Sequence, residues 1–308
     1  MQRASRRLGR LVRVTTEKGA ELTGFYAPAD RPGAPTLLYT HGLSGSFDTN
    51  FNYNLLDLPE AGELNILLTT STGYGNIATT RRGEPPVFKL TGSAFEIFTD
   101  CVPDLRAWVD LAASLSQGPV VLWGHSLGSS KVTHYLATTG DRRIAALALA
   151  SPSDVPGGFG DNVGREKIPQ FIALAREYVA AGKPEKIMPD DCVIGLLKQK
   201  ISAATLLDRF ESDVPADVFD FYGRGSRQAF KDLAKIDRPI FVLYCKTGEL
   251  VGPKGVDVAI ETIRAKASAA PSVDSLVVGG NHWYVGHEDE AMSGLVRWAL
   301  KHVGDKQA

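Results

Sequence analysis

Short, almost continuous apolar runs recur along this chain, and their spacing limits the fold more than any other feature. They cover residues 36–40, 65–70, 120–123, 145–150, 239–245 and 275–278. Strands of a parallel sheet are covered by helices on both faces and are therefore apolar along their whole length. Between and after these runs, apolar residues follow helical spacing, as over 98–112 and 292–299. The alternation predicts an α/β fold with a doubly wound, mostly parallel sheet, in which ligands bind beyond the carboxyl ends of the strands.

The first residues are basic and precede an expected strand pair. Residues 11–15 and 21–26 flank a turn-like segment at 17–19, which favours two adjacent strands. A transit peptide is the alternative, because several arginines come before the first acidic residue, namely Arg3, Arg6, Arg7, Arg10 and Arg13. No apolar stretch follows them, which argues against a secretory signal peptide.

Residues 155–225 interrupt the alternation of strands and helices. They contain no buried strand, but helical spacing recurs around 171–181 and 191–207. We interpret this segment as a helical cap insert above the carboxyl edge of the sheet, where it would shape a substrate pocket. Residues 1–154 and 226–308 are then the α/β core. An interaction surface or a stabilising insert is the alternative interpretation.

The run at 120–123 leads into Gly124-His125-Ser126-Leu127-Gly128, which predicts a nucleophilic serine. A serine at a sharp turn from a strand to a helix exposes its Oγ above the sheet. Glycines on either side leave room for the close backbone contacts of such a turn. Helical spacing follows the motif, as this interpretation requires. The alternative is a tight turn whose serine only caps the helix.

A serine hydroxyl is a weak nucleophile unless a base removes its proton. The expected chain order is serine, then acid, then histidine. The histidines that follow the serine are His134, His282, His287 and His302. His282 comes after the last apolar run and before the last helical pattern, so its loop can direct the imidazole towards Ser126. We predict His282 as the base, with a structural loop histidine as the alternative, and we place His287 at the rim of the site.

The acid of the triad is less well defined by the sequence. It is expected after the run at 239–245, where Glu249 is the nearest carboxylate and Gly248 occupies the position expected for aspartate. The extra methylene of glutamate could span the added distance. Asp154, after the run at 145–150, is the alternative acid, and a helix N-cap is its alternative structural role.

Acyl transfer also needs N–H groups that stabilise an oxyanion. We expect one from Leu127, directly after the serine, and the other from Leu43 in the glycine-containing loop at 41–46. His41 and His125 are expected to be hydrogen-bonded structural residues. Aromatic residues that flank the site are candidates for substrate contacts, and packing explains them equally well; they are Phe47, Tyr74, Trp283 and Tyr284.

Composition narrows the class of function. The chain has 308 residues and a formal net charge of −1, so it lacks the excess of basic residues typical of nucleic-acid binding. No apolar run approaches the length of a membrane span. The 3 cysteines are scattered, which favours neither a disulfide framework nor a metal cluster and indicates a reducing, cytoplasmic location. We expect a small-molecule substrate, no metal and no cofactor; the oligomeric state stays open.

These motifs together resemble the α/β-hydrolase superfamily over nearly the whole chain. Residues 41–47, 94–101, 124–132 and 280–286 are similar to a poorly characterised branch that includes fungal siderophore-esterase-like proteins and bacterial relatives. The resemblance implies Ser126 as nucleophile, His282 as base and an ester-like substrate. Relatives commonly carry an arginine in the turn that matches 70–74 and an aspartate at the position of Gly248, and this chain departs from both patterns.

We therefore expect a serine hydrolase that cleaves a carboxylic ester of a small or medium-sized molecule through an acyl-enzyme on Ser126. The same triad could act on thioesters or amides, or could transfer the acyl group to an alcohol or amine. Lyase chemistry on the same fold is a further alternative. From another class, the chain could be a non-catalytic ligand receptor that retains a hydrolase fold. Serine rather than aspartate at the turn disfavours dehalogenase and epoxide hydrolase chemistry.

Overall fold

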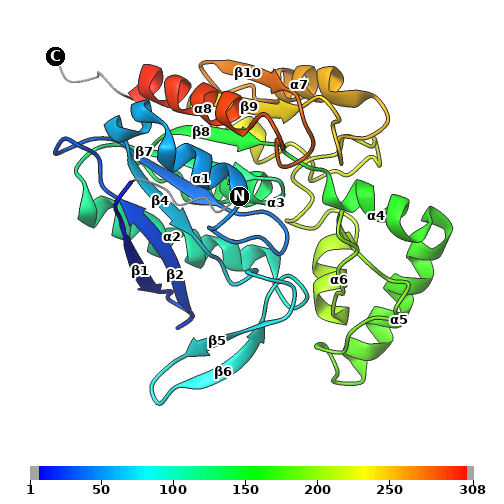
Figure 1. Cartoon of the computed structure of the whole chain (residues 1–308). Coiled ribbons are helices and arrows are strands. Elements are labelled where there is room, and N and C mark those ends of the chain that lie inside the picture. The colour runs from blue at the N-terminus through cyan, green and yellow to red at the C-terminus, as the bar shows by residue number, and fades with distance from the viewer. Residues whose placement is uncertain (1–6, 304–308) are drawn as a thin grey trace.

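The core of the computed structural model, which describes residues 7–303, is an eight-stranded sheet in the order β1-β2-β4-β3-β7-β8-β9-β10. The strands are β1 (Arg10–Thr15), β2 (Glu21–Ala27), β3 (Thr36–Thr40), β4 (Asn65–Thr69), β7 (Val120–His125), β8 (Ile144–Ala150), β9 (Ile240–Cys245) and β10 (Val273–Val278). β2 pairs antiparallel with β1 and β4. All other neighbours are parallel. The mostly parallel sheet confirms the predicted fold class (Figure 1).

Every apolar run singled out in the sequence forms a strand of this sheet. β3, β4, β7 and β9 are buried along their whole length, because helices cover both faces. The N-terminal pair β1–β2 also lies where its alternation predicts it. The bounds differ from the prediction by a few residues, most visibly at β7, which continues to His125 and so ends directly at the predicted nucleophile.

Helices pack on both faces of the sheet. The core helices are α1 (Asn50–Asp57), α2 (Cys101–Leu115), α3 (Leu127–Thr139), α7 (Gly255–Lys266) and α8 (Glu288–Val303). α1 and α8 bury Phe51 and Met292 on one face. α2 and α3 bury Trp108 and Val132 on the other (Figure 1). Within residues 7–303, none of the helices combines the length and apolarity that crossing a membrane requires.

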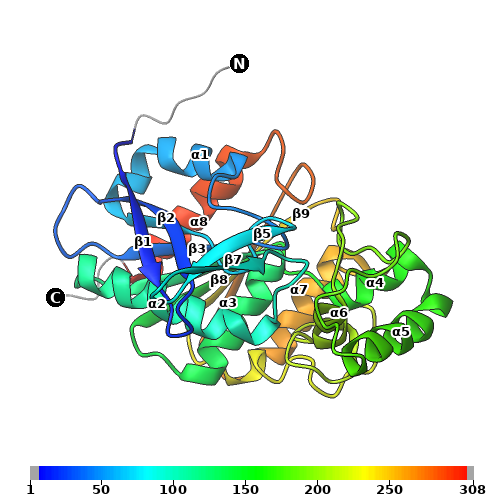
Figure 2. The ribbon, with the colours of Figure 1, turned by 90° about the horizontal axis from the view of Figure 1, so that it is seen from below.

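The segment 155–225 contains α4 (Val155–Val163), α5 (Ile168–Ala180) and α6 (Ala203–Phe210). These helices lie together beside the sheet in Figures 1 and 2 and share a hydrophobic cluster of their own. The helix expected over 191–207 is wrong in its first part, because helical structure begins only at Ala203. Gly195 and Lys198 have φ of 69° and 50°, which a right-handed helix excludes. An isolated bridge between Ile194 and Gln199 closes a tight turn there instead.

One β-hairpin was not predicted from the sequence. β5 (Ala78–Arg82) and β6 (Val87–Thr91) pair antiparallel outside the main sheet. Both strands are largely exposed or half-buried. They therefore lack the continuous apolar signal by which the buried strands were recognised.

Candidate active site

Ser126 lies at the sharp turn between β7 and α3. Its φ of 57° and ψ of −124° are unusual for a residue with a side chain, and such backbone strain is concentrated at functional sites. A Cβ on Gly124 would overlap the carbonyl oxygen of Gly128, and a Cβ on Gly128 would overlap that of Thr40. The backbone N–H of Ser126 donates to the Ala150 carbonyl at 2.8 Å. The flanking strands thus fix the turn, and only glycine fits beside it.

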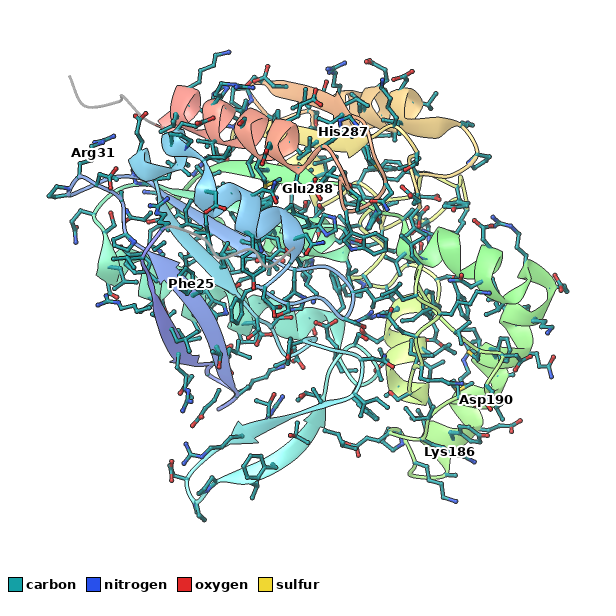
Figure 3. The ribbon with its side chains drawn as sticks, in the orientation of Figure 1. Phe25, Arg31, Lys186, Asp190, His287 and Glu288 are labelled. Carbon is teal, nitrogen blue, oxygen red and sulfur yellow. The ribbon has the colours of Figure 1, made fainter. Side chains whose placement is uncertain are left out.

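His282 lies in the loop between β10 and α8 and lines the same cavity as Ser126. The loop turns tightly, with positive φ at Gly280 and Tyr284, and the Tyr284 N–H donates to the Asn281 carbonyl at 2.7 Å. Figure 3 shows His287 and Glu288 where this loop enters α8. The tertiary structure therefore brings the predicted base and nucleophile to one cavity from distant parts of the chain.

The hydroxyl of Ser126 contacts Ser153 rather than His282. The two serine Oγ atoms lie 3.4 Å apart. Ser153 donates its own proton to the Ser151 carbonyl at 2.8 Å, so it accepts from Ser126. No hydrogen bond joins the Ser126 and His282 side chains in the described part of the chain. Catalytic hydrogen bonds are often long in free enzymes and shorten when substrate binds.

The imidazole of His282 is buried and neutral. Burial and the neighbouring His125 ring both lower the pKa of His282 well below 6.5, and the ring centroids are 4.9 Å apart. His125 donates its Nε2–H to the His282 carbonyl at 2.9 Å, which fixes the backbone of the predicted base. The Nδ1 atom of His282 is buried without a partner among residues 7–303. A neutral imidazole can accept the serine proton, and its Nδ1 is the atom that a triad acid would contact.

Glu249 lies in the loop after β9, close to His282. Its carboxylate accepts hydrogen bonds from Thr247 Oγ1 and from Cys245 Sγ at 3.3 Å. Partial burial raises the pKa of Glu249, but these bonds and the nearby backbone N–H of His282 outweigh burial and lower it. The carboxylate is therefore ionised at neutral pH and lies beside the backbone of the predicted base, although it does not bond to the ring.

Gly248 has a physical reason to be glycine. Its φ is 61°, and a Cβ there would lie 2.6 Å from Cγ2 of Val256. An aspartate at this position would push against α7. A side chain is therefore unfavourable at position 248, and the loop carries its carboxylate one position later, on Glu249.

Asp154, the alternative acid, is fully buried but already has its partners. It caps α4 by accepting from the Gly157 N–H at 2.7 Å, and it also accepts from the Tyr222 N–H at 3.1 Å. Its third partner is Arg224, at 3.1 Å. Burial raises the pKa of Asp154 to about 6 in spite of Arg224. These contacts fit the helix-capping role and favour Glu249 as the acid.

The predicted oxyanion amides both adjoin the turn that carries Ser126. Leu127 is the first residue of α3, so its N–H has no acceptor within the helix. Leu43 follows Gly42, whose Cβ would lie 2.7 Å from Cβ of Ser126. The glycine therefore lets the loop pass against Ser126, and Leu43 lines the cavity there.

His41 holds this loop in place. Burial and the nearby Lys131 together lower the pKa of His41 to about 4. The neutral ring donates from Nδ1 to the Gly42 carbonyl at 2.8 Å and accepts at Nε2 from the Ser71 N–H at 3.0 Å. Lys131 Nζ also reaches Ser71 Oγ at 3.3 Å. The turn at 70–74 is thus tied to α3 by Lys131.

A buried ion cluster that the sequence analysis missed joins the core to the helical insert. Glu96 pairs with Lys131 on α3 and with Arg209 on α6, and the three side chains are each 1% exposed. Buried charges are stable only when they are paired and hydrogen-bonded. No sequence pattern identifies this cluster, because its members come from segments that meet only in the folded chain.

The cavity beside Ser126 has a volume of about 60 Å³. Residues of the insert form part of its wall, and Leu196 and Leu197 at its rim are 38% and 67% exposed. Its lining consists of Tyr39, Gly42, Leu43, Gly45, Thr49, His125, Ser126, Val155, Gly195, Leu196, Leu197, Gln199, Leu250, His282 and Trp283. None of these residues carries a formal charge at neutral pH. The insert therefore contributes directly to the site, as a cap would.

The four aromatic residues predicted to contact a substrate lie in different environments. Trp283 lines the cavity, whereas Phe47 lines a separate cavity that also includes Phe25. Tyr74 is 48% exposed and lies outside the active-site lining. Tyr284 is buried and hydrogen-bonds Ser151. Only Trp283 of this group is therefore placed to touch a substrate next to Ser126.

The remaining downstream histidines lie outside this cavity and contact carboxylates. His134 contacts Asp232 at 2.7 Å, and His302 contacts Asp274 at 3.1 Å. His287 is half exposed and contacts a glutamate of α8. Within residues 7–303, no group of His, Cys, Asp and Glu side chains is arranged to hold a metal ion.

Comparison with known proteins agrees with this architecture. The model of the alpha/beta hydrolase family matches residues 37–296, and the chain belongs to this family. A comparison with curated protein sequences found no match. The assignment to the siderophore-esterase-like branch stays a prediction.

Several solved structures are similar over most of their length. DcsB in complex with a substrate analogue has a TM-score of 0.67 and 16% identity, with 97% of this chain and 100% of that chain covered. Est1E of Butyrivibrio proteoclasticus with bound ferulic acid has a TM-score of 0.64 and 16% identity, with 96% and 100% covered. An esterase of Pyrococcus furiosus has a TM-score of 0.60 and 15% identity, with 97% and 92% covered. At these identities the shared feature is the fold.

Proposed function

We propose that this protein is a cofactor-independent serine hydrolase that cleaves a carboxylic ester of a small or medium-sized molecule. The observation that carries the proposal is that Ser126, on a strained strand-to-helix turn, shares one cavity with His282. A serine hydroxyl beside a neutral imidazole is the arrangement that nucleophilic acyl transfer requires. The esterases among the structures of similar fold support the same reaction class.

In the proposed mechanism, His282 takes the proton of Ser126 Oγ while the oxygen attacks the acyl carbon. The carbonyl electron pair moves onto its oxygen, and the amides of Leu43 and Leu127 stabilise this oxyanion. When the intermediate collapses, the bond to the alcohol oxygen breaks and His282 gives its proton to the leaving alkoxide. Water then attacks the acyl-enzyme by the same route and releases the acid. Glu249 stabilises the imidazolium that forms in each step.

A fluorophosphonate probe tests the nucleophile. The probe reacts with activated serines, so we expect one labelled site in the wild type and no label in Ser126→Ala. Ser114→Ala is the matched control, because Ser114 is an exposed serine on α2 that bonds only to its own helix. Label that persists in Ser126→Ala would refute the assignment. Stoichiometric labelling without turnover of any ester would favour the ligand-receptor alternative.

A further inference from the structure

Lys131 is a buried lysine that the proposed mechanism does not use. It lies near the start of α3, the helix that Ser126 precedes. Its Nζ atom donates to Glu96 Oε1 at 2.5 Å and to Ser71 Oγ at 3.3 Å. Burying a charge is unfavourable unless it is paired and hydrogen-bonded, and Glu96 supplies the pairing. The contact with Ser71 leads from this pair to His41, which precedes the predicted oxyanion loop.

The hydroxyl of Ser71 has a fixed direction. Its oxygen accepts from Lys131 Nζ and from the Gly73 N–H at 3.2 Å, which uses both of its acceptor positions. The hydroxyl proton is therefore donated to His41 Nε2, 3.1 Å away. The backbone N–H of Ser71 donates to the same nitrogen at 3.0 Å. Because two donors face Nε2, the neutral ring carries its proton on Nδ1.

The Nδ1–H group of His41 holds the peptide that joins Gly42 to Leu43. It donates to the Gly42 carbonyl at 2.8 Å, and the Gly45 N–H donates to the same carbonyl at 3.2 Å. A trans peptide is planar, so its N–H points opposite to its C=O. The Leu43 N–H therefore points away from the His41 ring. Within residues 7–303 it donates to no backbone carbonyl, which leaves it available to an oxyanion.

The charge of Lys131 favours the same arrangement. Burial and Lys131 lower the pKa of His41, whereas the bond to the Gly42 carbonyl and the carboxylate of Glu96 raise it. A proton on Nε2 would face the N–H of Ser71 and break the contacts described above. Arg209 on α6 binds the other carboxylate oxygen of Glu96. The carboxylate is therefore held between the insert and α3, and Lys131 separates it from the ring's neighbour Ser71.

We propose that Lys131 is a positioning residue for the oxyanion site. Through Ser71 and His41, it directs the Leu43 N–H towards the oxygen on which negative charge develops. The inference rests on the proposed acyl transfer and adds a remote residue to it. Charge appears on that oxygen only as the reaction proceeds, so a misdirected donor weakens binding of the transition state more than binding of the substrate. Loss of Lys131 is therefore expected to lower kcat and to leave KM nearly unchanged.

The kinetics of two variants with p-nitrophenyl butyrate test the proposal. Lys131→Met removes the charge at similar length and should lower kcat by roughly 10- to 100-fold, less than the loss of a whole oxyanion donor. Ser71→Ala keeps the ion cluster and should lower kcat by roughly threefold to tenfold. KM should stay within roughly threefold of the wild type in both. His134→Gln is the matched control, because His134 also lies on α3 and contacts a carboxylate outside the cavity.

A transition-state analogue separates positioning from a general loss of structure. Propyl trifluoromethyl ketone carries the same acyl chain as this substrate. Ser126 Oγ adds to its carbonyl carbon, and the carbonyl electron pair moves onto the oxygen, as in the acyl-transfer intermediate. The inhibition constant should rise in each of the two variants by about the factor by which kcat/KM falls.

Thermal unfolding checks the fold of each variant, and Ser71→Ala serves alone if Lys131→Met does not fold. A change confined to KM, or a fall in kcat with an unchanged inhibition constant, would overturn the proposal. Values of kcat within about twofold of the wild type in every folded variant would overturn it as well.

Failure of the ester function is distinguishable from failure of the positioning role. If the wild type hydrolyses no ester, the proposed function fails, and the Leu43 amide is followed instead in the amide NMR spectrum of the isotope-labelled full chain. Its resonance should shift in Lys131→Met and in Ser71→Ala and stay in place in His134→Gln. A Leu43 resonance that does not move in the first two variants would refute the positioning role.

Discussion

Replacing Asp154 by asparagine separates the two carboxylates that compete for the role of triad acid. Asp154 bonds to the backbone of Gly157 and Tyr222 and pairs with Arg224. These contacts hold chain segments together and do not include the His282 ring. We therefore expect Asp154→Asn to change stability and its pH dependence, while kcat stays within roughly tenfold of the wild type.

The magnitude follows from the pKa of Asp154. Burial raises this pKa from 3.8 to about 6, so the folded protein binds the proton more tightly than the unfolded chain. The contribution to the free energy of unfolding is fully present below pH 3.8 and is lost as the pH rises through about 6. At about 1.36 kcal/mol per pKa unit, the loss by neutral pH is about 3 kcal/mol. Asparagine does not titrate, so the variant lacks this loss.

Urea unfolding of both proteins, followed by tryptophan fluorescence over a pH series, measures the difference. Between about pH 4 and about pH 7 the free energy of unfolding of the variant should gain about 2 to 3 kcal/mol relative to the wild type. A constant difference across the series would refute the reasoning. A loss of turnover by orders of magnitude in a folded variant would make Asp154 the triad acid.

Three further predictions follow from the site. Glu249→Gln should lower kcat by roughly 10²- to 10⁴-fold without changing thermal unfolding, and a loss below tenfold would remove Glu249 from the triad. Because burial lowers the pKa of His282, the acid limb of kcat/KM should lie below pH 6.5; a limb above that value contradicts the assignment. Lys131→Met leaves Glu96 with Arg209 as its buried cation. The substitution should lower the free energy of unfolding, measured in urea, by about 3 kcal/mol. A change below about 1 kcal/mol would show that the Glu96–Lys131 pair contributes little to stability.

The fold was predictable mainly because β3, β4, β7 and β9 are buried along their whole length. Such strands are visible in the sequence alone as continuous apolar runs, since burial on both faces favours apolar residues at nearly every position. A strand that is exposed to solvent lacks this apolar run and is not predicted by this signal. The β5–β6 hairpin is largely exposed and gives no such signal. The helix expected at 191–207 fails in its first part, where Gly195 has a positive φ and a Cβ would lie 2.5 Å from Cδ2 of Leu43.

The candidate site was predictable in part for the same reason. Ser126 follows the buried strand β7 and His282 follows the half-buried strand β10, and parallel strands bring their carboxyl ends to one edge of a sheet. The sequence could not distinguish the two candidate acids, because Glu249 and Asp154 both follow strands. Only the contacts of each carboxylate in the folded chain distinguish them.

The amino-acid sequence by itself determined the order of strands and helices, the glycine-flanked turn at Ser126 and the strand end that carries His282, because each depends on local backbone geometry and hydrophobic periodicity. Only the tertiary structure decided which carboxylate lies beside the backbone of His282 and which aromatic residue lines the cavity. Those properties depend on desolvation and on contacts between distant segments, and neither exists until the chain has folded.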